Sequence, residues 1–125
     1  MKKINKDNLL QFLNYYHRFH DSYITTINYD VSNANVELFV DIQWTGEPIK
    51  KFDGYFETNK TKMMIQFIGV KKFKCKEFFQ WDYFNEVYLD YIKLENKELI
   101  CFSNDKNDSF IYIVCDNIKY KETNF

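Results

Sequence analysis

The sequence predicts an α+β fold in which one N-terminal amphipathic helix packs on a mainly antiparallel β-sheet of about six to eight strands. Two observations support this prediction: one helical stripe of apolar residues near the start, and strand-like segments that follow one another with no helix between them. Strands connected directly in this way pair antiparallel. We expect the 125 residues to form one domain spanning residues 1–125.

The helix is expected over Asp7–Phe19. Asp7 is the predicted N-cap, because its carboxylate accepts hydrogen bonds from the free amides of a first helical turn. The apolar residues of this segment recur at helical spacing and form one stripe, which consists of Leu9, Phe12, Leu13 and Tyr16. A helix with a single stripe buries a single face, so it must lie against a larger element.

The clearest strand signal is the alternation of apolar and mostly polar residues over Val36–Trp44. The other expected strands are Tyr23–Asp30, Ile49–Glu57, Lys62–Phe73, Glu86–Leu94, Leu99–Ser103 and Phe110–Cys115. A change of apolar phase near Tyr91 predicts a β-bulge there. Ile118 and Tyr120 belong either to a short last strand or to a frayed tail.

Composition excludes several functions. The 17 basic and 18 acidic residues leave a net charge of −1, so no global field attracts nucleic acid or an anionic membrane. Arg18 is the single arginine, which disfavours a phosphate clamp built from guanidinium forks. Three glycines are too few for a phosphate-binding loop. We therefore expect no cofactor, no nucleic-acid partner and no membrane association.

Three cysteines, Cys75, Cys101 and Cys115, are odd in number and lack metal-binding spacing. They are expected to be reduced, buried thiols. The first residues carry lysines without a following apolar stretch, so neither a signal peptide nor a transmembrane helix is expected. Both observations favour a cytoplasmic location.

The segment His17–Ser22 contains the residues that most resemble a reactive site. His17, His20 and Asp21 are candidate metal ligands, and His20-Asp21-Ser22 contains the residue types of a hydrolase triad. No HExxH motif and no GxSxG elbow accompany them. We favour a structural interpretation, in which the segment ends the helix and leads into the first strand.

The aromatic segment Phe78–Phe84 and the strand after it provide the candidate partner-binding residues. Trp and Tyr next to acids are typical anchors of protein interfaces. On an ideal strand Glu86, Tyr88 and Asp90 share one face. The predicted partner-binding residues are Trp81, Asp82, Tyr83, Glu86, Tyr88 and Asp90.

Two short motifs carry a resemblance to a known family. They are Phe19-His20-Asp21-Ser22, followed by an alternating strand, and Phe67-Ile68-Gly69-Val70, with Trp81 further on. The chain resembles small bacterial proteins with a Phe-His-Asp-Ser element, some of which are similar to immunity proteins of polymorphic toxin systems. The resemblance implies a protein that neutralises a toxin by binding it, and it implies no catalytic residues.

The leading hypothesis from the sequence is therefore a non-enzymatic binding protein, an immunity-type inhibitor whose partner is a toxin domain. Two alternatives stay open. One is a small metal-binding protein or hydrolase that uses His17, His20 and Asp21, and the other is a subunit that self-associates as a homo-oligomer.

Overall fold

The structure is a computed structural model, and it describes residues 1–47, 49–50, 54, 56–57, 59–75, 88–94, 97–103 and 111–123. For residues 49–50, 56–57, 88–94 and 97–103 the description covers the backbone alone.

One α-helix, α1 (Leu9–Tyr15), is followed by a short 3-10 turn, η1 (His17–Phe19). The strands of the described residues are β1 (Lys2–Ile4), β2 (Tyr23–Asp30), β3 (Asn35–Ile42), β4 (Ile49–Lys50), β5 (Phe56–Glu57), β6 (Thr61–Ile68), β7 (Lys72–Cys75), β8 (Tyr88–Leu94), β9 (Lys97–Ser103), β10 (Ile111–Cys115) and β11 (Asn117–Thr123).

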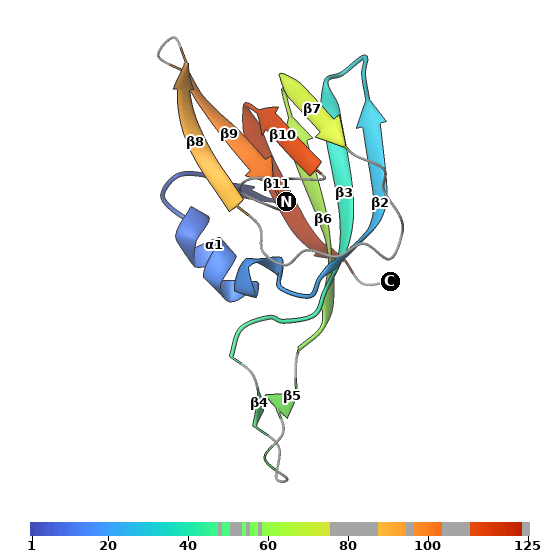
Figure 1. The fold of residues 1–125 in the computed structure, drawn as a ribbon, viewed down its shortest axis with the longest axis vertical. Coiled ribbons are helices and arrows are strands. Elements are labelled where there is room, and N and C mark those ends of the chain that lie inside the picture. Colours follow the sequence, from blue (N-terminus) through green and yellow to red (C-terminus); the bar gives the residue numbers. More distant parts are fainter. Residues whose placement is uncertain are drawn as a thin grey trace.

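These strands form two larger sheets and a small hairpin (Figure 1). The five-stranded sheet has the order β1-β11-β6-β3-β2, the four-stranded sheet has the order β7-β10-β9-β8, and β4 pairs with β5. All the strand pairs are antiparallel. The predicted α+β class, with a helix on an antiparallel sheet, is confirmed.

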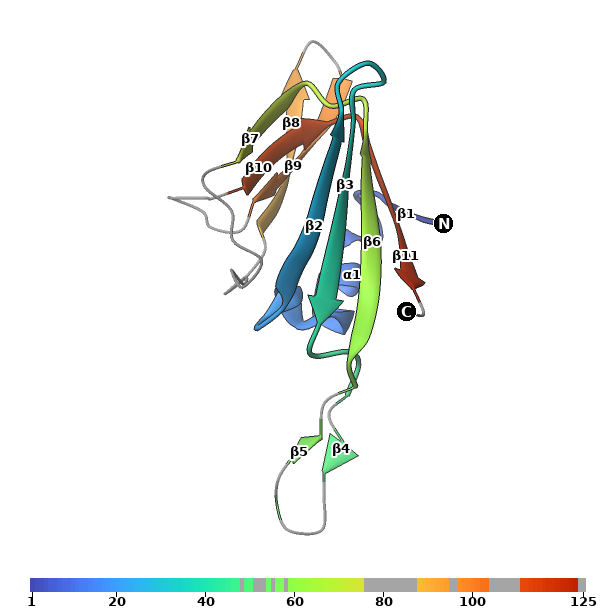
Figure 2. The ribbon, with the colours of Figure 1, turned by 90° about the vertical axis from the view of Figure 1, so that its right-hand side faces the viewer.

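The helix and the four-stranded sheet lie on the same side of the five-stranded sheet (Figures 1 and 2). The hydrophobic core fills the space between these layers. Its helix residues are Phe12, Leu13 and Tyr16, with Leu9 packed against them at partial exposure, so the predicted apolar stripe is confirmed. The inward residues of β3 are Val36, Leu38, Val40 and Ile42, and all of them are fully buried.

The chain passes from one sheet to the other at two adjacent points. Strand β6 continues into β7 through Gly69, and β10 continues into β11 through Asp116. The two passages are joined by hydrogen bonds from the Asp116 amide to the Ile68 carbonyl (3.0 Å) and from the Lys71 amide to the Val114 carbonyl (2.8 Å). Gly69 has a φ of +68°, a conformation that side-chain-bearing residues rarely adopt.

This geometry corrects the strand predicted over Lys62–Phe73. Its alternation suggested one element, but the residues divide into β6 and β7 because Gly69 allows a sharp change of direction. The bulge predicted near Tyr91 is also wrong, since β8 and β9 pair without a register shift from Tyr88 to Leu94. The described bulge lies instead in β2, between Ile24 and Thr26.

The helix is shorter than predicted. It starts after Asn8 rather than after Asp7, and its N-terminal loop is held by the Asn5 side chain, which accepts hydrogen bonds from the Asp7 and Asn8 amides at 2.9 and 3.0 Å. It ends at Tyr15, because His17, Arg18 and Phe19 have φ values of +52°, +51° and +61°. A right-handed helix cannot continue through residues in this conformation.

The C-terminal strand settles an open alternative. Residues 117–123 form the full strand β11, which lies between β1 and β6, so Ile118 and Tyr120 belong to a strand rather than to a frayed tail. Of the cysteines with described side chains, Cys115 is buried as predicted, but Cys75 is exposed, so the prediction for Cys75 is wrong. In the described part of the chain, no helix has the length and apolar character needed to cross a membrane.

Candidate functional site

The His17–Ser22 segment forms a tight left-handed turn rather than a face of a helix. Three backbone hydrogen bonds close it, from Phe19 to Tyr16, from His20 to His17 and from Ser22 to Phe19, at 2.9 to 3.0 Å. Phe19 and Ser22 are fully buried. A serine nucleophile must be reached by substrate, so a buried Ser22 does not fit the role that the triad pattern suggests.

The candidate metal ligands of this segment point to different partners. The Nε2 atom of His17 lies 2.7 Å from the carbonyl oxygen of Gly46, whereas His20 pairs with Asp21 at 3.3 Å on the surface. Within the described residues, no group of three or more His, Cys, Asp or Glu side chains is placed to hold a metal ion. The arrangement joins η1 to the Gly46 loop and holds no assembled ligand set.

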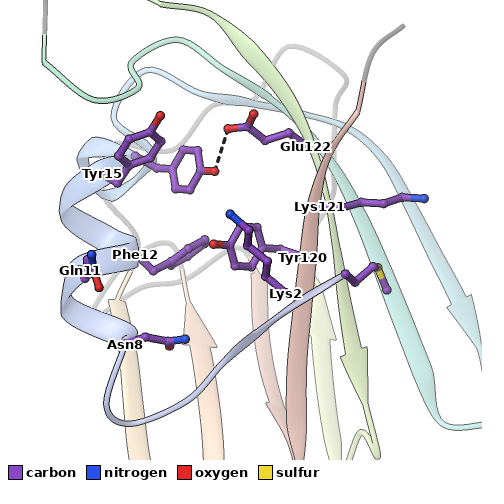
Figure 3. Close-up of a pocket in the computed structure, with 10 residues that line it drawn as sticks. Lys2, Asn8, Gln11, Phe12, Tyr15, Tyr120, Lys121 and Glu122 are labelled. Carbon is purple, nitrogen blue, oxygen red and sulfur yellow. Dashed lines mark hydrogen bonds between the residues drawn. The ribbon is translucent and has the colours of Figure 1, made fainter.

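An open cleft of about 720 Å³ lies between α1 and β11, and we call it the α1–β11 cleft (Figure 3). Its volume falls within the range of ordinary ligand pockets, about 300–1,000 Å³. Aromatic rings form much of its wall, and a carboxylate lies at its rim. The residues that matter for its chemistry are Gln11, Tyr15 and Tyr16 from α1 and its end, Lys2 from β1, and Tyr120 and Glu122 from β11.

One hydrogen bond fixes the acid of the cleft. The Tyr16 hydroxyl donates to Glu122 Oε1 at 2.8 Å, which leaves the second carboxylate oxygen available to another donor. Burial, and then the hydrogen bond to Glu122, raise the pKa of the Tyr16 phenol far above its usual range. Tyr16 therefore remains a donor at every physiological pH, and it binds one oxygen of the exposed Glu122 carboxylate.

The aromatic rings of the cleft pack against one another. Tyr15 and Tyr16 meet edge to face with centroids 4.8 Å apart, and Phe12 and Tyr120 lie 4.6 Å apart. The Tyr15 carbonyl accepts a hydrogen bond from the Gly46 amide at 2.7 Å. Tyr15 is nevertheless 50% exposed, so a partner can reach its ring without unfolding the wall.

A second candidate surface is the outer face of the five-stranded sheet, which we call the open face. No described element covers it (Figure 2). Phe39, Met64 and Lys121 lie side by side across it, because the register places Met64 opposite both of the others. Figure 3 shows the Lys121 side chain extending away from the cleft rings on the other side of β11.

Charges on the open face are separated by sign. The acids are on β2 and β3: Asp30, Glu37 and Asp41. The lysines that β1 and β11 present on this face are Lys3, Lys119 and Lys121. Lys62 of β6 is also on this face, with its Nζ atom 4.0 Å from Oδ1 of Asp41. Hydrogen bonds from Asn33 lower the pKa of Asp30, so this carboxylate stays ionised.

The partner-binding residues predicted from the sequence are not tested by this geometry. Trp81, Asp82, Tyr83 and Glu86 lie outside the described residues, and only the backbone of Tyr88 and Asp90, on β8, is described. The cleft contains the same combination of residue types, tyrosines beside an acid. Its parts come from both ends of the chain, so no local motif signalled it.

The two motifs behind the family resemblance have structural positions. Phe19, Ser22 and Phe67 are fully buried, and Gly69 makes the passage between sheets. Comparison of the sequence with models of protein families and with curated proteins gives no match.

Proposed function

We propose that this protein is a non-enzymatic binding protein of the immunity type, which inhibits a toxin by occupying part of its surface. The observation that carries the proposal is the α1–β11 cleft, where the Glu122 carboxylate is hydrogen-bonded to the buried Tyr16 and lies near the half-exposed Tyr15. Such a site suits recognition of a basic side chain, since the carboxylate attracts the charge and the ring faces attract a cation.

The chemistry of the cleft favours binding over catalysis. Glu122 has a tyrosine as its partner, and the raised pKa of this tyrosine makes it a poor general acid at neutral pH. The other polar groups, such as Gln11 and Lys2, contribute hydrogen bonds and charge at the walls. Aromatic walls with few polar groups are typical of interface anchors.

The inhibitor role fits the charge of Glu122, the acid of the cleft; the bases of its lining are Lys2 and Lys121. Toxins that act on nucleic acid present basic surfaces, because they must bind phosphates. An arginine or lysine of such a surface would enter the cleft beside Glu122 and Tyr15. The region predicted from the sequence, Trp81–Asp90, remains a second candidate for the toxin-binding surface.

The test is co-expression in bacteria of this protein with each toxin domain encoded beside its gene. Wild-type protein is expected to restore growth against one of them. Glu122→Lys and Tyr15→Ala are expected to weaken the complex at least about tenfold, measured by titration calorimetry, because a like charge and a lost ring oppose the basic anchor.

The matched control is Glu47→Lys, which makes the same charge change at an exposed acid that does not line the cleft. It should protect as the wild type does. Circular dichroism must first show that each variant is folded. If Glu122→Lys and Glu47→Lys bind the toxin with equal affinity, the cleft is not part of the interface. If the wild-type protein protects against none of the neighbouring toxins, the immunity role is refuted.

A further inference from the structure

The open face contains a pairing that is unfavourable for an isolated molecule. Lys3 and Lys119 are direct cross-strand neighbours in the β1–β11 ladder, and both are exposed. Like charges at directly opposite positions destabilise a sheet. Lys121 follows on the same face of β11, so three lysines gather at one side with no acid among the described residues of β1 and β11 on this face.

The opposite side of the same face has the reverse charge. Glu37 lies in the same row as Lys119, because the register pairs Glu37 with Gln66 and Gln66 with Lys119. Asp30 and Asp41 lie above and below this row, and the β2 and β3 residues on this face include no base. The face is therefore polarised across its strands, from acidic at β2–β3 to basic at β11–β1.

Two adjacent apolar side chains, Phe39 and Met64, lie at the centre of the face, next to Gln66 on β6. Met64 is 8% exposed although no described element covers it, and its cross-strand neighbours are Phe39 and Lys121. Ile68 lies on the same face of β6, two rows away along the strand. An apolar centre inside a charged rim is the usual anatomy of a protein interface.

We propose that the open face binds a second copy of this chain, which forms a symmetric dimer with the twofold axis in the interface and parallel to the strands. This rotation places β6 on β6, β3 on β11 and β2 on β1 of the other copy. It brings Glu37 over Lys119 of the second copy twice, once on each side of the axis. A twofold axis in the interface but perpendicular to the strands would instead place β3 on β3, and so the acids of one copy over the acids of the other. The charge separation across the face therefore favours the axis parallel to the strands.

The size of the face falls at the small end of stable dimer interfaces. Five strands about 4.8 Å apart, with four outward rows about 6.6 Å apart, give a footprint on the order of 600 Å² per copy. Stable interfaces bury about 800 Å² of accessible surface per partner. The second copy would place its Glu37 over Lys119 and would cover Phe39 and Met64. This dimer is independent of the toxin-binding cleft, which lies on the other side of the sheet.

Charge-reversal variants test the arrangement. Wild-type protein is expected to sediment as a dimer at micromolar concentration in analytical ultracentrifugation. Glu37→Lys and Lys119→Glu should each weaken the dimer at least about tenfold, since each places like charges opposite one another twice. An equimolar mixture of the two variants should restore a heterodimer, because both contacts then join opposite charges.

Glu47→Lys is the matched control and should leave the dimer intact, since Glu47 lies outside the face. A monomeric wild type at these concentrations would overturn the proposal. Unweakened single variants would place the dimer on another surface, and a mixture that fails to associate would refute the parallel twofold axis. The experiment involves no toxin, so its outcome does not depend on the proposed inhibitor role.

Discussion

The two faces of strand β3 differ sharply although their residues alternate in one segment. On the inner face Val36, Leu38 and Ile42 have no exposed surface, and they join the helix in the core. On the outer face Glu37, Phe39 and Asp41 remain partly exposed. This strand therefore provides stability with one set of side chains and surface chemistry with the other, so changes at adjacent positions should have different consequences.

The largest expected effect is on the inner face. Leu38→Ala should lower the free energy of unfolding by about 2–5 kcal/mol, because it leaves a cavity in a packed core. Phe39→Ala, one residue further on the outer face, should lower it by about 1 kcal/mol or less, the scale of a cross-strand pair. Urea unfolding, at a protein concentration low enough to avoid dimers, measures both. Losses of similar size would show that both faces are covered in the monomer.

The next effect concerns the point where the chain leaves the five-stranded sheet. A Cβ on Gly69 would lie 3.0 Å from Cγ of Asp116 and closer still to its Oδ2, in addition to the strain of a positive φ. Gly69→Ala should therefore lower the free energy of unfolding by about 1–3 kcal/mol, measured by urea unfolding.

Gly46→Ala is the control for this change. Gly46 also has a positive φ, of +58°, but its Cβ would meet only Tyr15 at an ordinary 3.4 Å. It should lose less stability than Gly69→Ala, and Asp116→Ala should recover part of the loss when it is combined with Gly69→Ala. A double variant as unstable as Gly69→Ala alone would show that the crowding against Asp116 contributes nothing.

Sequence patterns predicted the elements that are defined locally. The hairpin of β2 and β3 follows from alternation and a short polar turn, and the stripe of α1 follows from helical spacing. The spacing of apolar residues does not reveal a left-handed turn built from residues other than glycine, so the early end of the helix at His17–Phe19 was not predictable. The alternation of apolar residues also continues across Gly69, where only the glycine marks the bend between β6 and β7.

Features that join distant segments of the chain could not be predicted from local sequence patterns. The role of β11 as a central strand depends on pairing with β1, where Lys2 meets Tyr120 from the other end of the chain. The α1–β11 cleft and the charge separation of the open face depend on the same register. Once the strand order is known, the sequence gives the face of each residue by simple alternation.

The smallest expected effect lies where the inner face opens to solvent, at the hydrogen bond between Tyr16 and Glu122. Tyr16→Phe keeps the buried ring and removes the hydroxyl. At neutral pH it should lower the free energy of unfolding by about 0.5–1.5 kcal/mol, the usual contribution of one hydrogen bond.

The pH dependence gives this last variant a distinctive signature. Burial and the hydrogen bond to Glu122 raise the pKa of Tyr16 in the folded protein, whereas an unfolded tyrosine titrates near pH 10. Above about pH 10 the unfolded chain releases a proton that the folded protein keeps, so wild-type stability should fall as the pH rises. Tyr16→Phe lacks this proton, and the difference between the two proteins should narrow between pH 7 and about pH 11. Urea unfolding at several pH values measures the effect, and the control is Tyr29→Phe, at a tyrosine that is 46% exposed. If the difference in stability between wild type and Tyr16→Phe stays constant with pH, Tyr16 ionises alike in the folded and unfolded states.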